Sequence, residues 1–168
     1  ESFQSFLNDI GRYPLLTADQ EIELSRKIAR FIELRDADGE LTTKEKRELR
    51  IGQRAKDKLI NSNLRLVVSV AKKYQNKIKM TTLEISDLIQ EGCIGLERAA
   101  EKYDGTRGYK FSTYAYWWIR QAINRGIDTQ LRSIRIPTNQ LEKINKLHRF
   151  KIEFMQNHGR KPTLDEMV

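Results

Sequence analysis

Residues 111–126 read FSTYAYWWIRQAINRG, and this stretch decides the fold class of the 168-residue chain. At 100° per residue, one stripe of a helix collects the small and apolar side chains Ala115, Ile119, Ala122, Ile123 and Gly126. The opposite arc collects Thr113, Trp117, Arg120, Gln121 and Asn124, with Tyr114 and Arg125 at its edge and Trp118 at its border. We therefore expect an amphipathic helix with a buried stripe and an aromatic, cationic outer face.

The same spacing of three and four residues recurs along the rest of the chain, without a useful run of period-two alternation. It predicts helices over residues 2–10, 17–34, 42–54, 57–74, 86–102, 112–126 and 139–157. Thr17 is a plausible N-cap of the second helix. Thr82 or Ser86 is expected to start the fifth and Ser112 or Thr113 the sixth, while 75–82 is a basic loop. The predicted fold class is all-α, a multi-helix bundle followed by a C-terminal helix that leads into a further domain.

The composition excludes several classes of protein. A single cysteine and two isolated histidines give neither an internal disulfide nor a metal centre, so no metal and no cofactor are expected. No apolar run approaches the roughly 18 residues of a membrane span, and no signal peptide opens the chain. We expect a cytoplasmic protein without a membrane partner, and the start at Glu1 rather than Met suggests a fragment.

The net charge of +8 is unevenly distributed. Residues 1–56 hold 11 basic and 11 acidic side chains, whereas residues 101–135 hold seven basic and three acidic ones. Residues 103–118 also hold seven of the chain's 14 aromatic side chains. Aromatic rings among cations form stacking platforms for single-stranded bases, whereas the ordinary alternative is that these rings fill a small core. An entire arc of Trp, Tyr, Arg, Gln and Asn favours the nucleic-acid surface.

The helix predicted around residues 85–100 has the opposite character. Its core stripe consists of Ile85, Leu88, Ile89, Cys93, Leu96, Ala99 and Ala100, which makes Cys93 a small core residue. The outer arc consists of Asp87, Gln90, Glu91, Ile94 and Glu97. An exposed Ile94 among carboxylates suits a helical protein partner with a basic rim, and a solvated acidic face is the alternative.

Three motifs carry a resemblance to a known family. Asn63–Tyr74, Asp87–Leu96 and Arg107–Ile123 resemble the second conserved region of housekeeping-type (primary or group 2) bacterial sigma factors. Phe6–Thr17 resembles the late part of the first region, and Arg132–Pro137 with Gly159–Thr163 resembles the entry to the third. The segments Ala115–Trp118 and Leu96–Arg98 are similar to cyanobacterial members. The resemblance implies four parts: 1–35 as the late first region, 36–56 as a connector or helical arm, 57–135 as sigma domain 2, and 136–168 as a truncated start of domain 3.

The resemblance also implies a function and a set of DNA-binding residues. Such a factor binds core RNA polymerase, recognises the promoter minus-ten element and melts DNA by capturing flipped nontemplate-strand bases; it is not an enzyme. One flipped base would enter a pocket of Tyr103, Asp104, Tyr109, Thr113, Tyr114 and Trp117. A second would enter a pocket of Glu21, Asn63, Leu66 and Ser112. Trp117 and Trp118 would form a wedge, Gln121 with Asn124 would face the upstream base pair, and Glu142 would read an upstream extension. Phosphates would be held by Lys110, Arg120, Arg125 and Arg135.

The same resemblance assigns the acidic helix to the polymerase. Asp87, Gln90 and Glu91, with Ile94, would dock on the clamp helices of the largest polymerase subunit. Cys93 replaces a usual polar residue and Glu97 a usual apolar one, departures that favour a group 2 factor over a primary one.

Three alternatives stay open at the level of sequence. A base-flipping DNA repair enzyme would need a poised acid, for which Asp104 in its turn is the nearest candidate. A generic single-stranded nucleic-acid binder would share the aromatic face without reading a particular sequence. An anti-sigma factor is a further partner that is compatible with sigma function.

Overall fold

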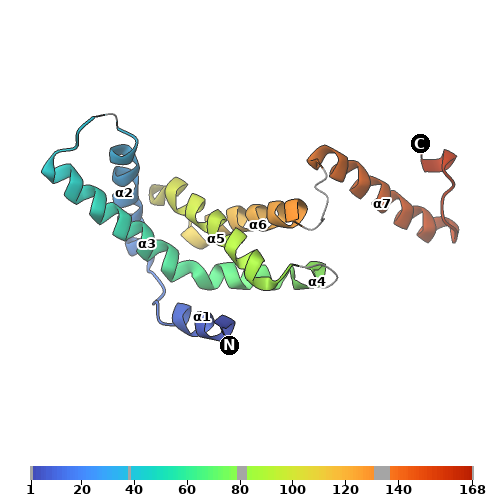
Figure 1. The fold of residues 1–168 in the computed structure, drawn as a ribbon, viewed down its shortest axis with the longest axis horizontal. Helices are drawn as coiled ribbons and strands as arrows, with labels where there is room; N and C mark the ends of the chain where they lie inside the picture. The colour runs from blue at the N-terminus through green and yellow to red at the C-terminus, as the bar shows by residue number, and fades with distance from the viewer. Residues whose placement is uncertain (1, 38, 79–82, 131–136, 168) are drawn as a thin grey trace. The chain divides into compact units, whose positions relative to one another are not determined.

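The computed structural model describes residues 2–37, 39–78, 83–130 and 137–167, and all regular structure in these ranges is helical (Figure 1). The all-α prediction is therefore confirmed. The α-helices are α1 (Ser2–Gly11), α2 (Ala18–Arg35), α3 (Thr43–Lys72), α4 (Gln75–Ile78), α5 (Ile85–Lys102), α6 (Phe111–Gln130) and α7 (Thr138–His158). Two short 3-10 turns are η1 (Gly105–Arg107) and η2 (Asp165–Met167).

The chain divides into two compact units, Glu1–Ile127 and Asp128–Val168. The first unit contains α1 to α5, η1 and most of α6, and the second contains α7 and η2. The core of the first unit forms where α2 packs on α3 and α3 packs on α5. Its largest fully buried side chains are Ile28, Leu59, Val67, Val70, Leu88, Leu96, Phe111, Ile119 and Ile123.

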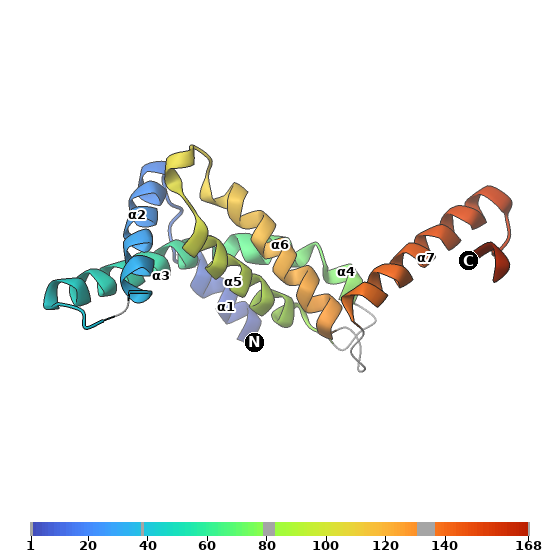
Figure 2. The same ribbon diagram turned by 90° about the horizontal axis from the view of Figure 1, so that it is seen from above.

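Helices α5 and α6 lie side by side in both views (Figures 1 and 2). Glycine makes this close approach feasible, because a Cβ atom on Gly95 would lie 2.6 Å from the Trp118 carbonyl oxygen and 2.8 Å from the Ala122 Cβ. Gly92 likewise leaves room for Val67 of α3, whose Cγ1 would be 2.6 Å from an added Cβ. These two glycines, one turn apart on α5, thus let α3 and α6, the helix that carries the aromatic face, pack closely on α5.

Helix α3 is continuous, so the predicted break between residues 54 and 57 is wrong. Thr42 caps its start through a reciprocal pair with Glu45, and the helix then runs for 30 residues. The polar stretch is held as helix by packing, because Gly52, Ala55 and Lys56 are buried. The predicted boundary between connector and second domain, at residues 56 and 57, falls inside this helix.

Other predicted helix starts are corrected in detail. Glu84, not Ser86, precedes α5, and Thr82 lies outside the described residues. Neither Ser112 nor Thr113 caps α6, since the helix already begins at Phe111. Residues 75–78 of the predicted basic loop form α4. The Thr17 cap is confirmed, with Gln20 as its reciprocal partner.

Two glycines end helical segments in the left-handed region that favours this residue. Gly108 has φ 79° after η1, and Gly159 has φ 67° after α7. Beyond Gly159, Glu166 accepts the Thr163 backbone N–H at 2.8 Å and closes the turn that leads into η2. The Thr163–Glu166 pair thus caps a short 3-10 turn.

Among the described residues, no helix combines the length and apolarity needed to cross a bilayer. The same residues contain no group of three or more His, Cys, Asp or Glu side chains arranged to hold a metal ion. Cys93 is half-buried, and this burial raises the pKa of its thiol, as expected for a packing residue rather than a reactive one.

Candidate nucleic-acid interface

Helix α6 has the two faces that its sequence predicts. Ala115, Ile119, Ile123 and Gly126 are buried and Ala122 is half-buried, which confirms the core stripe. On the opposite arc Thr113, Trp117, Arg120, Gln121 and Arg125 are exposed, while Tyr114 and Trp118 are half-buried at the margins. The tertiary structure therefore leaves the polar, aromatic arc in contact with solvent.

Trp117 is the most informative residue on this arc. Its side chain is 62% exposed, which is unusual for so large an apolar group. The Arg120 guanidinium lies 5.6 Å from the centre of its ring, and the Tyr116 ring packs edge-on at 5.7 Å. An exposed indole held between a cation and a second ring is prepared to stack on a base.

A continuous cluster of rings backs the start of α6. Tyr103 lies 5.1 Å from Phe111 and 6.0 Å from Tyr109, measured between ring centroids. Tyr114 is 5.9 Å from Tyr109 and 6.2 Å from Trp118, so four predicted site residues are brought together. The Tyr103 hydroxyl donates to the Tyr109 carbonyl at 2.8 Å, and burial raises the pKa of this phenol. Tyr103 thus forms the floor of the cluster, whereas Tyr109 and Tyr114 are more accessible.

The loop before α6 has its own anchor in Asp104. The carboxylate accepts the Thr106 backbone N–H at 3.0 Å and the Thr106 hydroxyl at 2.6 Å, and these bonds lower its pKa. Asp104 therefore shapes the η1 turn that leads toward Tyr109. A small cavity of about 80 Å³ lies beside this turn, lined by α2 residues and by Tyr103, Gly105, Gly108, Tyr109 and Lys110.

The residues predicted for a second base pocket are buried or half-buried. Glu21 is buried, and its carboxylate accepts the Phe111 backbone N–H at 3.0 Å. The Asn63 amide donates to the Leu59 carbonyl at 2.8 Å within α3. Leu66 and Ser112 are half-buried. In this structure Glu21 and Asn63 have internal partners.

The remaining predicted DNA contacts fall in different places. The Asn124 amide donates to the Tyr74 hydroxyl at 3.3 Å, so it is tied to the end of α3 while Gln121 stays exposed. Lys110 is exposed at the mouth of the small cavity. Glu142 is exposed on α7 in the second unit, and Arg135 lies outside the described residues.

The predicted protein-docking face on α5 is less acidic than its sequence indicates. Ile94 is 47% exposed and Gln90 is exposed, as expected. The Glu97 carboxylate, however, accepts a hydrogen bond from the buried Lys56 ammonium at 2.7 Å. Asp87 is half-buried and accepts the Glu84 backbone N–H at 2.8 Å.

Glu91 also differs from its predicted free position on this face. It is half-buried, and its side chain occupies the space that a Cβ atom on Gly126 would need, 2.5 Å from the Glu91 Cγ. Gln90, Ile94 and Glu97 are the exposed members of the face; Glu97 is paired with Lys56, and Glu91 packs toward α6.

Sequence reasoning missed three lysines that sit over aromatic rings. Lys102 lies over Trp118 at 5.2 Å, Lys73 over Tyr116 at 5.5 Å and Lys77 over Tyr74 at 5.1 Å, each measured from Nζ to the ring centroid. The signal for Lys73 and Lys77 was present, because residues 58–83 contain no acidic side chain. The partner of Lys73 could not be inferred, since Tyr116 is distant in sequence, whereas Tyr74 lies only three residues before Lys77.

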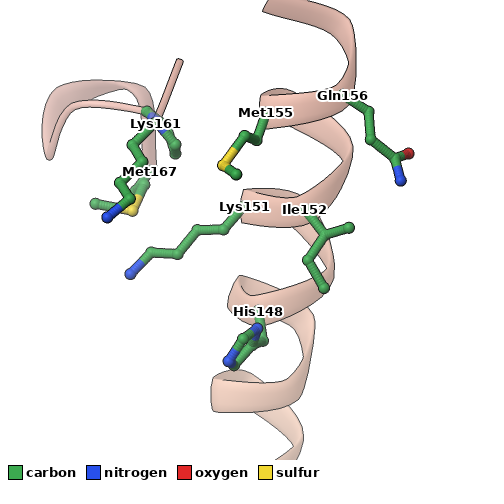
Figure 3. Close-up of a pocket in the computed structure, with 8 residues that line it drawn as sticks. His148, Lys151, Ile152, Met155, Gln156, Lys161 and Met167 are labelled. Atoms are coloured by element: carbon green, nitrogen blue, oxygen red, sulfur yellow. The ribbon is translucent and has the colours of Figure 1, made fainter. Parts of the chain in front are cut away.

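A larger groove of about 580 Å³ lies in the second unit, between α7 and the segment that follows it. Lys151 and Met155 point across it toward Lys161 and Met167 (Figure 3). None of the residues that line this groove belongs to the predicted site. The described residues of the predicted site, Glu142 excepted, lie in the first unit.

Comparison with known proteins agrees with this arrangement. The family described as Sigma-70 region 2 matches residues 59–133, and Sigma-70 factor, region 1.2 matches residues 1–30. The RNA polymerase sigma factor SigA4 of Synechococcus elongatus is 51% identical over 97% of this chain and 51% of its own length. The sigma factor SigA of a Nostoc species is 48% identical over 100% of this chain and 47% of its own length. The chain spans about half the length of these curated relatives.

The helical fold and both matches define the class as sigma factors of RNA polymerase. The chain belongs to the sigma-70 family, of which it carries region 1.2 and region 2, and the similar proteins above are cyanobacterial. Region 2 includes both α5 and the described part of α6, so one family segment carries the two opposed faces.

Proposed function

We propose that this chain is the part of a sigma factor that binds core RNA polymerase, recognises the promoter minus-ten element and melts it by capturing flipped nontemplate-strand bases. The observation that carries this proposal is the exposed Trp117 indole, backed by Arg120 and Tyr116 on the solvent face of α6. Flipping a base costs a few kcal/mol, and stacking on an aromatic ring returns on the order of 1–3 kcal/mol per base. Binding energy at this face is therefore of the right size to favour an open strand.

The proposed base pocket uses the ring cluster beside Trp117. Tyr109, Tyr114 and Thr113 would contact the captured base, while buried Tyr103 and the Asp104 turn would hold those residues in place. Trp118 would complete the wedge, with the Lys102 ammonium over its ring. Gln121, next on the exposed arc, would face the upstream base pair with Asn124, and Arg120, Arg125, Lys110 and Arg135 would hold phosphates.

For the second proposed pocket, Glu21 and Asn63 would have to exchange their internal hydrogen bonds for contacts with a base, beside Leu66 and Ser112. Glu142 would read an upstream extension of the element. The four-part division at 1–35, 36–56, 57–135 and 136–168 remains a proposal of the same kind.

The polymerase would dock on α5. Ile94 and Gln90 provide the accessible centre, with Asp87 and Glu91 at its margin. The clamp helices of the largest polymerase subunit are the proposed partner, and an anti-sigma factor would compete for the same face. Such a subunit acts in the cytoplasm and is not catalytic.

For the alternative of a base-flipping repair enzyme, Asp104 does not fit the role of general acid. A general acid must hold a proton near neutral pH, whereas hydrogen bonds from Thr106 lower the pKa of this carboxyl group. The generic single-strand binder differs from the main proposal only in its sequence preference, so one experiment separates the two.

The test measures binding of a fluorescent nontemplate-strand oligonucleotide to the full-length protein assembled with core polymerase. The minus-ten sequence should bind at least tenfold more tightly than a scrambled one, and Trp117→Ala should remove most of this difference. Tyr13→Ala, which also removes an exposed ring from the first unit, should leave it unchanged.

Core polymerase affinity is measured in parallel. Trp117→Ala should leave it within about twofold, because this side chain lies on α6 and not on the docking face. Equal binding of the minus-ten and scrambled sequences would overturn minus-ten recognition and identify a generic single-strand binder. A matched loss of oligonucleotide and polymerase binding would overturn the role given to Trp117.

A further inference from the structure

The longest acid-free stretch around the candidate interface lies at the end of α3. Residues 58–83 contain six Lys and Arg residues and no Asp or Glu. Lys72, Lys73 and Lys77 are exposed, and among the described residues none of them joins an ion pair. Four other cations of the first unit, Lys27, Arg30, Arg35 and Lys56, have carboxylate partners. This end of the helix therefore has unneutralised positive charge.

The tertiary structure places this charge against α6. The Lys73 ammonium lies 5.5 Å from the centre of the Tyr116 ring, and Tyr116 packs edge-on against Trp117. One turn beyond, the Lys77 ammonium lies 5.1 Å from the Tyr74 ring, whose hydroxyl accepts from Asn124. Figure 2 shows α4, which carries Lys77, close to the C-terminal half of α6. Lys73, Tyr74, Lys77 and Tyr116 form one surface, here called the lysine strip, that adjoins Trp117.

The lysine strip presents cations, whereas Trp117 presents a ring. Tyr74 is buried, and Tyr116 is half-buried and packed edge-on against Trp117, so the accessible groups of this surface are the two ammonium groups and not the rings. Cation–π contacts hold both ammonium groups close to the surface without neutralising their charge. Positioned, unpaired ammonium groups are ligands for phosphate, and in a duplex the phosphates are the groups displayed outward.

We infer that the lysine strip binds the sugar-phosphate backbone of double-stranded DNA next to the strand opened at Trp117. This inference rests on the proposed function, because Trp117 marks the end of the duplex. In this inference Trp117 contacts the bases of the opened strand, and Lys73 contacts the backbone of the adjoining duplex. Lys73 and Lys77 are the phosphate ligands, and Tyr116 is a positioning residue that holds Lys73.

The experiment uses the full-length protein assembled with core polymerase and two probes. One probe is a fork, a duplex that ends in a single-stranded minus-ten segment; the other is that single strand alone. For Lys73→Gln/Lys77→Gln, fork binding should weaken about three- to tenfold. The slope of log K against log salt should become less steep by roughly 0.9 for each of the two lost phosphate contacts. Binding of the single strand should stay within about twofold of the unmodified protein.

A matched control makes the same change in charge near the start of α3, far from the lysine strip. Lys44→Gln/Lys46→Gln alters two exposed lysines near the other end of α3, about 40 Å away at 1.5 Å per residue, and should leave both probes unaffected. Tyr116→Phe keeps the ring under Lys73 and should bind the fork normally, whereas Tyr116→Ser should reproduce part of the lysine defect.

The outcomes separate this inference from the proposed function. Unchanged fork binding and salt slope in Lys73→Gln/Lys77→Gln would overturn the inference, as would an equal loss on the fork and on the single strand. A loss as large in the Lys44→Gln/Lys46→Gln control would show a general charge effect and overturn it too. Failure of the proposed function has a different signature: no assembly with core polymerase, or single-strand binding that ignores Trp117→Ala.

Discussion

The Glu21 carboxylate accepts a hydrogen bond from the Phe111 backbone N–H at 3.0 Å, although the two residues are 90 positions apart. Phe111 is the first residue of α6, and the preceding residue, Lys110, has no acceptor in its side chain. A buried acid of α2 therefore satisfies an N–H at the start of α6, where a carboxylate is also favoured by the helix dipole. Region 1.2 thereby stabilises the helix that carries the aromatic face.

Glu21→Ala should destabilise the chain by about 1–2 kcal/mol, because the N–H of Phe111 would lose its buried acceptor. Glu21→Gln should cost less, since an amide oxygen can still accept this bond without the charge. Chemical denaturation measures both values. Asp19→Asn, an exposed change in the same helical turn, is the control and should stay within about 0.5 kcal/mol. Equal stability of Glu21→Ala and the unmodified chain would contradict the capping role.

Gly95→Ala should destabilise the chain by about 1–3 kcal/mol, because an added Cβ would overlap the Trp118 carbonyl oxygen and force α5 away from α6. Backbone atoms cannot rotate aside as a flexible side chain can. Thermal unfolding of the variant measures the effect. Gly11→Ala is the matched control, since nothing lies within 4 Å of its added Cβ. A neutral Gly95→Ala would mean that the two helices can separate at little cost.

Lys56→Met should lower stability at neutral pH by about 1–2 kcal/mol, less than for a fully buried pair because Glu97 remains partly in solvent. The Lys56 ammonium bonds Glu97 and Glu101 at 2.7 Å each. Burial of Lys56 opposes its charge, but these two bonds raise its pKa. The bond from Lys56, followed by that from Arg35, lowers the pKa of Glu101 from 4.5.

The sign of the pH dependence follows from that lowered pKa. The stabilisation from Glu101 is complete above its ordinary pKa of 4.5 and is lost as the pH falls through the lower folded value. Urea denaturation should therefore show the gap between the unmodified chain and Lys56→Met narrowing below about pH 4.5. Lys58→Met, at a neighbouring exposed lysine, is the control. A gap that stays constant into acid would exclude the Lys56–Glu101 pair as its source.

Ile94→Asp should weaken binding to core polymerase by about tenfold or more, because a charge would enter the apolar centre of the proposed docking face. Stability should change little, since Ile94 is 47% exposed. Ile51→Asp makes the same change at a residue of α3 that is 42% exposed, and it should bind polymerase normally. Direct titration of core polymerase with labelled protein measures both affinities. Normal binding by Ile94→Asp would remove α5 from the proposed interface.

Local patterns predicted the helices well, and they failed where a distant segment decides the structure. Thr17 and its partner Gln20 are three residues apart, so that cap was visible in the sequence. The start of α6 was not, because its acceptor Glu21 comes from another helix. The continuity of α3 was also missed, since its polar first half looks solvated until Gly52 packs against Phe31 of α2 and Ala55 is buried.

The candidate site shows the same division. The exposure of Trp117 and Ile94 followed from helical period alone, because each lies opposite a core stripe. The negative charge that α5 offers to a partner could not be inferred from helical period. Glu97 is paired with Lys56, and Glu91 packs against Gly126. Side-chain pairing depends on which helices pack together, and the spacing of apolar residues along one helix does not determine this.

The sequence by itself determined that this chain is helical, that α6 has an aromatic outer face, and that its family is sigma-70. These properties depend on residues within one turn or one motif of each other. Only the tertiary structure decided which groups support that face: Glu21 at its start, Gly95 beneath it, and Lys73 beside Tyr116. The physical reason is that caps, close approaches and cation–π contacts form between segments that meet only after the helices pack.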